Sequence, residues 1–222
     1  ILLFTIGCSN VKPTDILNSL TPSNGYELTE YAYGNDERQK LDVYIPKKRN
    51  NKPPIVFVYG GAWKKGDKKD FKFVAQALTG LGYTVIVPDY RLYPAVRFPA
   101  FVDDVADAIQ YTNQHAAKLL GRPMTAYILM GHSAGAHTAA LLATDLGYLQ
   151  KRKVNASLAA VIALSGPYDL NLEDPEVMPI FAGSNAWQAK PLANVHSGMA
   201  PMLLMHGEDD ERVLPFHSKR FA

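Results

Sequence analysis

The stretch that decides the fold is AYILMGHSAGAHTAALLA, residues 126–143. Ala126–Met130 is an apolar run, as expected of a strand buried on both faces, and Ala134–Ala143 is a helix-forming run of small residues. Between them, residues 131–135 read G-H-S-A-G, which fits the pattern G-x-S-x-G. After a strand and before a helix, this pattern projects the serine hydroxyl beyond the sheet. The setting predicts a nucleophilic Ser133, although the pattern alone would also suit a plain glycine-rich turn.

Apolar runs and amphipathic segments alternate on both sides of this stretch. We expect a β-hairpin from residues 26–33 and 41–45, further strands at 55–59, 83–87, 159–164 and 201–205, and helices at 73–81 and 101–120. Strands that alternate with helices, and that are apolar along most of their length, are typical of a parallel sheet. The sequence therefore predicts an α/β domain with a mainly parallel central sheet and helices on both faces.

Composition narrows the class of protein. Of the 222 residues, 47% are hydrophobic and 20% are charged, which excludes a disordered or collagen-like chain. A net charge of +2 offers no basic excess for a nucleic-acid partner. The single cysteine, Cys8, excludes an internal disulfide and a cysteine-rich zinc site. No apolar run is long enough for a complete transmembrane helix.

A second glycine motif follows the strand expected at 55–59. Residues 59–63 read Y-G-G-A-W, and glycines in such a place let backbone N–H groups approach a ligand closely. The segment is not a phosphate-binding P-loop, because Asp67 follows Gly66 where that motif needs lysine. No G-x-G-x-x-G fingerprint follows any expected strand, so no nucleotide cofactor is expected.

Taken together, these motifs resemble those of the α/β-hydrolase-fold esterases. Residues 59–63 are similar to their H-G-G-x-W motif, and residues 131–135 match their nucleophile elbow. Residues 88–92 (PDYRL), 165–169 (SGPYD) and 206–213 (HGEDDERV) resemble three further segments, in the family's order. The resemblance runs from about residue 26 to the end. It is strongest to the hormone-sensitive-lipase-like and feruloyl-esterase-like (BD-FAE) branch, and it extends to the kynurenine formamidases.

The resemblance implies a role for each matching residue. Ser133 would be the nucleophile, and Asp210 would orient the catalytic histidine. The backbone N–H groups of Gly61, Ala62 and Ala134 would stabilise the oxyanion. The implied activity is that of a serine carboxylesterase, which hydrolyses a small or carbohydrate-linked ester through an acyl-enzyme, without a metal or organic cofactor. The departure is Tyr59, where many relatives have a histidine that shapes the loop.

Two further residues are candidates for the substrate pocket. Trp63 would flank the acyl group beside the oxyanion loop, or it would simply anchor that loop. Tyr168 begins a long connection, residues 168–200, which is a candidate lid or pocket wall.

The general base is the missing element of the expected triad. In this fold the histidine follows the acid in the chain, and only His217 follows Asp210 here, seven residues later. The resemblance places the base much further on, after another helix and strand. We therefore expect the last strand and the catalytic histidine to be absent from these 222 residues, which alone would be catalytically crippled. Three alternatives stay open: an amidase or peptidase, an arylformamidase, and a non-catalytic binding homologue without the base.

The first residues suggest a location. An apolar stretch ends at Gly7-Cys8 and polar residues follow, which is typical of a bacterial lipoprotein signal, although a short strand with a structural cysteine is the alternative. We expect residues 1–25 to be a signal remnant and tether, with lipidation at Cys8, and residues 26–222 to be the hydrolase domain. The protein would then be anchored to the bacterial cell envelope by lipid alone, or otherwise be secreted or periplasmic. The expected partner is a small-molecule ester, and the sequence gives no sign of the oligomeric state.

Overall fold

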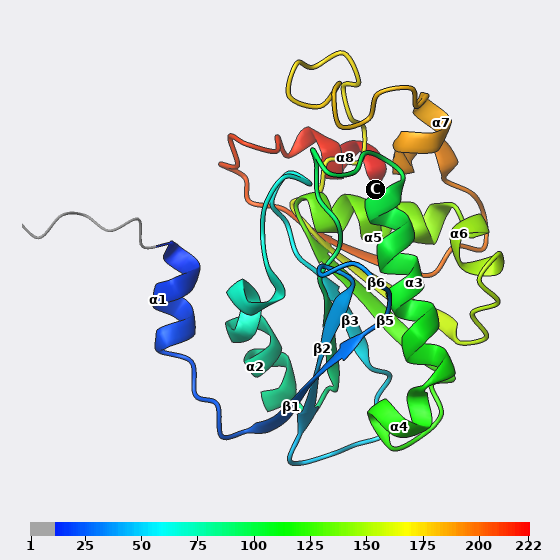
Figure 1. The fold of residues 1–222 in the computed structure, drawn as a ribbon. Helices are drawn as coiled ribbons and strands as arrows, with labels where there is room; N and C mark the ends of the chain where they lie inside the picture. The colour runs from blue at the N-terminus through cyan, green and yellow to red at the C-terminus, as the bar shows by residue number, and fades with distance from the viewer. Residues whose placement is uncertain (1–11) are drawn as a thin grey trace, which may run out of the picture.

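A single seven-stranded sheet organises the chain (Figure 1). The computed structural model describes residues 12–222. The strand order is β1-β2-β4-β3-β5-β6-β7, in which the five strands from β4 to β7 run parallel and β1 and β2 form an antiparallel hairpin. The strands are β1 (Tyr26–Ala32), β2 (Lys40–Pro46), β3 (Ile55–Val58), β4 (Val85–Pro88), β5 (Ala126–His132), β6 (Ser157–Leu164) and β7 (Met202–Met205). The predicted α/β class, hairpin and mainly parallel sheet are confirmed.

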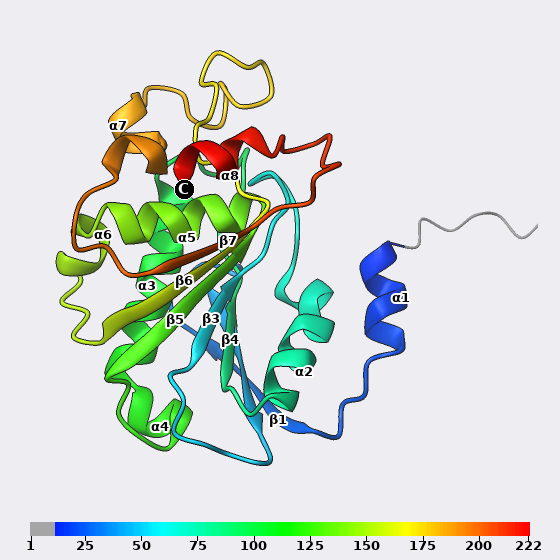
Figure 2. The ribbon, with the colours of Figure 1, turned by 180° about the vertical axis from the view of Figure 1, so that it is seen from behind.

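Helices cover both faces of the sheet, as predicted. Helix α2 lies on one side of the sheet, and α3 and α5 lie on the other (Figure 2). The α-helices are α1 (Pro13–Ser19), α2 (Lys72–Gly80), α3 (Ala100–Gln114), α4 (Ala116–Leu120), α5 (Ala134–Thr144), α6 (Gly147–Gln150), α7 (Ala186–Ala189) and α8 (Phe216–Phe221), and the 3-10 helices are η1 (Lys68–Phe71) and η2 (Pro191–Asn194). Among residues 12–222, no helix combines the length and apolarity that a membrane span requires.

The structure corrects two expected elements. The helix expected at 101–120 is divided at His115 into α3 and α4. Part of the expected tether is the helix α1, which begins with Pro13, a residue favoured in a first turn. The Asn18 side chain fixes this helix to the domain, because its amide donates to the Lys69 carbonyl (2.9 Å) and its oxygen accepts from the Phe73 N–H (3.1 Å).

The backbones of β3, β5 and α5 meet very closely at the predicted elbow. A Cβ on Gly135 would lie 2.0 Å from the Val58 carbonyl oxygen, and one on Gly131 would lie 2.3 Å from the Gly135 oxygen. Both positions therefore exclude any side chain. All eleven residues of α5 are buried, so its small residues let the helix lie directly on the sheet. The two glycines thus fix where the helix starts, and with it the position of Ser133.

Substitution at Gly135 tests this packing. We expect Gly135→Ala to lower the free energy of unfolding by about 1–3 kcal/mol or more, because the new methyl group overlaps a backbone carbonyl. Gly80→Ala is the matched control: Gly80 lies at the end of α2 and a Cβ there meets nothing within 4 Å. We expect that change to be neutral or to stabilise by about 0.5–1 kcal/mol. Urea denaturation measures both, and equal stabilities of the two variants would contradict the packing argument.

Candidate active site

Ser133 occupies the strained turn between β5 and α5. Its backbone is at φ 52° and ψ −120°, a left-handed conformation that a non-glycine residue adopts only under constraint. Its N–H donates to the Leu164 carbonyl (2.8 Å), and its carbonyl accepts from the His137 N–H (3.1 Å). Its Oγ makes no hydrogen bond to any described residue and is therefore available to a ligand. This geometry is that of a nucleophile elbow.

The loop after β3 lies against this elbow. A Cβ on Gly60 would be 2.9 Å from the Ser133 Cβ, so the loop and the serine are in direct contact. Gly61, Ala62 and Trp63 follow with positive φ angles of 138°, 53° and 58°. Such a run is unfavourable for alanine and tryptophan and requires support from the surroundings. Within the described chain, the N–H groups of Gly61, Ala62 and Ala134 have no hydrogen-bond acceptor, which leaves three donors near the serine.

Tyr59 supplies much of the support for this loop. Its hydroxyl donates to Asp89 Oδ1 (2.6 Å) and accepts from the Arg38 Nη2 (2.8 Å). The same guanidinium donates to the Gly66 carbonyl (2.7 Å), and the Lys68 N–H donates to Asp89 Oδ1 (2.8 Å). Burial raises the pKa of Tyr59 far above its ordinary value, so the phenol remains a neutral donor. The start and the end of the oxyanion loop are thus tied to one buried carboxylate.

Aromatic packing holds the Tyr59 ring in place. The ring is fully buried and lies stacked on Phe71 (centroids 5.3 Å apart) and on Tyr90 (4.8 Å). Sequence reasoning identified Tyr59 as a departure from the family motif but did not identify its partners. Asp89 lies in the PDYRL segment, so that motif could have indicated it as a functional residue. Arg38 lies in the hairpin turn, and no motif marks it.

Asp210 is held as a charged carboxylate in the loop after β7. Its Oδ1 accepts from the backbone N–H groups of Arg212 and Val213, each at 3.0 Å. The Val213 N–H is the main reason that the pKa of Asp210 lies below its ordinary value, and Arg212 N–H and the Ser165 side chain add to it. His206 supports the loop through Nε2, which lies 2.6 Å from the Val213 carbonyl and 3.6 Å from Asp210 Oδ2.

One cavity of 290 Å³ joins these parts. Its lining residues come from the loop after β3 (residues 59–66, the expected oxyanion loop), the elbow, the end of β6 and the loop after β7 (residues 206–213, the expected acid loop). They are Gly61, Ala62, Lys65, His132, Ser133, Ser165, Asp210, Arg212 and Val213. Four residues expected from the sequence, Gly61, Ala62, Ser133 and Asp210, therefore lie around the same space. Ala134 is buried directly behind them in α5 and does not line the cavity.

The other expected site residues lie elsewhere. Trp63 is 4% exposed and packs against Phe101 and Phe181 in the core, so it anchors the loop and does not line the cavity. Tyr168 is fully buried and stacks on Phe221 (4.5 Å), so its assignment to the substrate pocket around Ser133 is corrected as well. Both side chains carry large aromatic rings, and both rings are buried in the core. Cys8 lies outside the described residues.

The described residues bring one histidine to the cavity, His132. His217 instead accepts the Asp169 N–H at Nδ1 (3.3 Å), and His137 is buried, which lowers its pKa to about 4. His132 precedes both Ser133 and Asp210 in the chain, whereas in this fold the histidine follows the acid. The general base of the expected triad is therefore not assigned to a residue of the described chain. Within residues 12–222, no three histidine, cysteine or carboxylate side chains are grouped as metal ligands.

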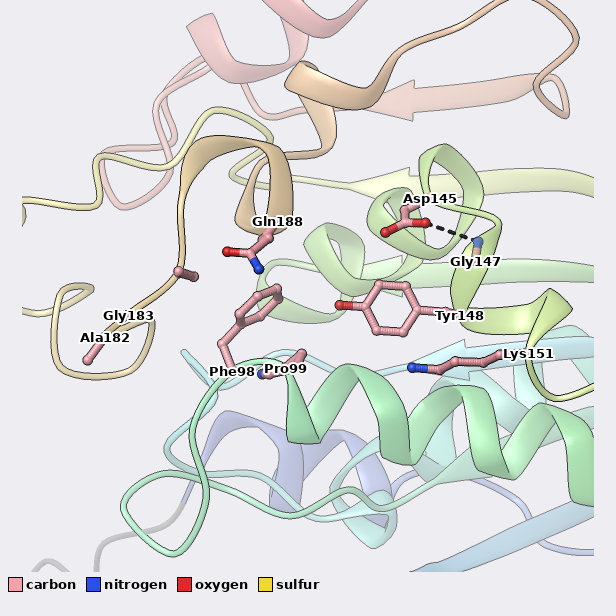
Figure 3. A pocket seen from close by; sticks show the side chains of 10 residues that line it. Phe98, Pro99, Asp145, Gly147, Tyr148, Lys151, Ala182, Gly183 and Gln188 are labelled. Atoms are coloured by element: carbon pink, nitrogen blue, oxygen red, sulfur yellow. Dashed lines mark hydrogen bonds between the residues drawn. The ribbon is translucent and has the colours of Figure 1, made fainter.

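A separate hollow of 460 Å³ lies at the other end of α5. Figure 3 shows Tyr148, Phe98 and Gln188 around it, with the Asp145 carboxylate accepting the Gly147 N–H (3.0 Å) at its edge. None of the residues expected to act in catalysis lines this hollow. Of these two spaces, the cavity at Ser133 is the one lined by residues expected to act in catalysis.

Solved structures place this fold among the α/β hydrolases. A truncated carbohydrate esterase from gut microbiota superposes with a TM-score of 0.71 at 22% identity, covering 90% of this chain and 84% of that chain. Esterase 2 of Thermogutta terrifontis gives a TM-score of 0.71 at 24% identity, covering 90% of this chain and 78% of that chain. At these identities the likeness establishes the α/β-hydrolase fold.

Curated relatives are similar in sequence over most of the domain. A probable isoprenylcysteine α-carbonyl methylesterase of Arabidopsis thaliana is 30% identical over 223 residues, covering 89% of this chain and 47% of the relative. The kynurenine formamidase of Salmo salar is 31% identical over 145 residues, covering 64% of this chain and 47% of the relative. The chain spans about half the length of these relatives.

The model of the BD-FAE family matches residues 41–222, which contain the oxyanion loop, the elbow and the acid loop. This range is most of the chain and includes every strand of the sheet after the start of β2. It agrees with the resemblance carried by the five sequence motifs. The chain belongs to the BD-FAE family of α/β-hydrolase-fold esterases.

Proposed function

We propose that the protein is a serine carboxylesterase whose nucleophile is Ser133. The observation that carries this proposal is the shared cavity, which contains Ser133, Gly61, Ala62 and the charged carboxylate of Asp210. No residue in the described range 12–222 hydrogen-bonds the Ser133 Oγ or accepts from the N–H groups of Gly61 and Ala62. Each part suits one step of acyl transfer. A binding module would have no need of a strained serine beside unpaired donors.

The proposed reaction has two halves. Ser133 Oγ attacks the ester carbonyl as its proton passes to a histidine base, and the carbonyl oxygen becomes an oxyanion held by the N–H groups of Gly61, Ala62 and Ala134. The imidazolium faces Asp210 and returns its proton to the leaving alcohol, so an acyl-enzyme remains. Water activated by the same base then releases the acid. We propose that this histidine reaches the cavity from outside the described residues.

The proposed substrates are small or carbohydrate-linked esters. A cavity of 290 Å³ accommodates a short acyl group. The relatives support the class, since the similar proteins include a methylesterase and a carbohydrate esterase. The proposed mechanism uses no metal or organic cofactor.

A second candidate is cleavage of an aryl formamide, which the similarity to the kynurenine formamidase of Salmo salar favours. The same serine and the same oxyanion donors serve either carbonyl. Phenyl acetate and formanilide separate the two functions, each rate being divided by its own hydroxide-catalysed rate. We expect the normalised kcat/KM to be higher for phenyl acetate. A higher normalised kcat/KM for formanilide would contradict the esterase proposal and favour the formamidase.

Loss of the nucleophile gives the most direct test of the proposal. In the complete protein, we expect Ser133→Ala to abolish labelling by a fluorophosphonate and to lower ester hydrolysis by at least about 10³-fold. Ser157→Ala is the matched control, since Ser157 is an exposed serine at the start of β6, away from the cavity. It should be labelled and active like the wild type. Undiminished labelling of Ser133→Ala would show that the nucleophile lies elsewhere.

Removal of the Tyr59 hydroxyl tests the support of the oxyanion loop. We expect Tyr59→Phe to lower kcat by about 3- to 30-fold with KM within about twofold, because donors that are displaced affect the transition state more than the bound ester. Tyr83→Phe is the control, since no described residue hydrogen-bonds that hydroxyl. Both variants are assayed well below their melting temperatures, so that unfolding does not contribute. A Tyr59→Phe enzyme with wild-type kcat would contradict a supporting role.

A further inference from the structure

We propose that Lys65 and Arg212 make this active site selective for esters that carry a carboxylate. The inference rests on the proposed function, because it concerns the cavity that contains Ser133.

The two cations belong to the cavity itself. Both residues line it together with Ser133, Lys65 from the oxyanion loop and Arg212 from the acid loop. Their main chains are fixed by the same bonds that shape the site. The Lys65 N–H donates to the Gly61 carbonyl (3.1 Å), and the Arg212 N–H donates to Asp210 Oδ1 (3.0 Å). The two basic residues therefore border the cavity from different loops, one after β3 and one after β7.

Neither cation has a carboxylate partner among the described residues. Ion pairs within that part of the chain engage other basic side chains, such as Lys68 with Asp42 (2.7 Å) and Arg91 with Asp104 (2.7 Å). Lys65 and Arg212 form none, so their charges are available to a ligand. Cations kept without a partner at the wall of a cavity attract anions more strongly there than on a flat surface.

The lining of the cavity has a positive balance. Asp210 is the one carboxylate among the lining residues, and two backbone N–H groups already occupy its Oδ1. Glu208, Asp209 and Glu211 belong to the same loop but are exposed and do not line the cavity. The negative charges of these three exposed side chains weaken the attraction between the site and a distant anionic ester. The selectivity is therefore a short-range effect on the bound ester, and long-range steering contributes little.

An adjoining hollow of 180 Å³ extends the site past Arg212. Arg212 and Val213 line both spaces. Pro167, Leu170 and Val177 give the second hollow an apolar side, and Asp174 adds a carboxylate whose Oδ1 already accepts the backbone N–H groups of Glu176 and Val177. A substrate with an aromatic or aliphatic body and a carboxylate can thus contact the apolar side and Arg212 together. The proposed class is an ester of such an acidic, partly apolar molecule.

A matched pair of esters tests the proposal on the complete protein. 4-Acetoxybenzoate carries a carboxylate, and 4-acetoxybenzamide is its neutral counterpart of nearly equal shape. After each rate is divided by its hydroxide-catalysed rate, we expect kcat/KM to favour the anion by about tenfold at low salt, as two exposed charge contacts allow. The preference should fall as salt rises.

Charge-removing variants assign the effect to the two residues. Lys65→Gln and Arg212→Gln should each lower the ratio of kcat/KM for the anion to kcat/KM for the neutral ester by about threefold. Lys64→Gln is the matched control, because Lys64 is exposed like Lys65 but does not line the cavity. It should leave both rates unchanged. Equal rates for the two esters, or equal effects of Lys64→Gln and Lys65→Gln, would overturn the proposal.

A binding measurement separates this inference from the proposed function. Ligand-observed NMR compares the affinities of 4-hydroxybenzoate and 4-hydroxybenzamide, which needs no catalysis. We expect tighter binding of the anion by wild-type protein and loss of that difference in Lys65→Gln and Arg212→Gln. If neither ester is hydrolysed but the anion binds selectively, the proposed function fails and the charge selectivity stands. Equal binding of both ligands refutes the selectivity by itself.

Discussion

The approach of Gly135 to the carbonyl of Val58 is the contact on which the site depends. Helix α5 can begin directly behind β5 only because neither Gly131 nor Gly135 carries a side chain. That start puts Ser133 in its strained backbone conformation and leaves the N–H of Ala134 without an intrahelical partner. The same contact draws β3 to the elbow, so the loop that follows β3 meets the serine. A single close packing of backbones thus brings Ser133 together with the N–H groups of Ala134 and of the loop after β3.

The oxyanion loop is a second constraint, because its conformation is unfavourable by itself. Two non-glycine residues, Ala62 and Trp63, hold positive φ angles. Two interactions stabilise this strained conformation: the burial of the Trp63 ring, and the hydrogen bonds that join Tyr59 to Asp89 and Arg38. Such strain persists where the surroundings over-determine it, which is common at sites of catalysis. Tyr59 holds the loop through its hydroxyl.

Sequence patterns predicted the parts that local rules determine. The elbow, the buried strands and the hairpin follow from glycine spacing and apolar periodicity, and the structure has them within a few residues. Helix α1 was missed because it depends on Asn18 bonds to residues about 50 positions away. Trp63 and Tyr168 were misplaced because a pattern cannot tell a core aromatic ring from a pocket ring. The partners of Tyr59 required the fold, since Arg38 and Asp89 converge only in three dimensions.

The central claim is that Ser133 and the backbone donors around it form one catalytic centre. The most direct measurement is a crystal structure of the complete protein after reaction with a phosphonate ester. The account predicts phosphorus bonded to Ser133 Oγ, with one phosphonyl oxygen about 2.7–3.1 Å from the N–H groups of Ala134 and of Gly61 or Ala62. A phosphonyl oxygen turned away from these donors, or an adduct on another residue, would contradict it.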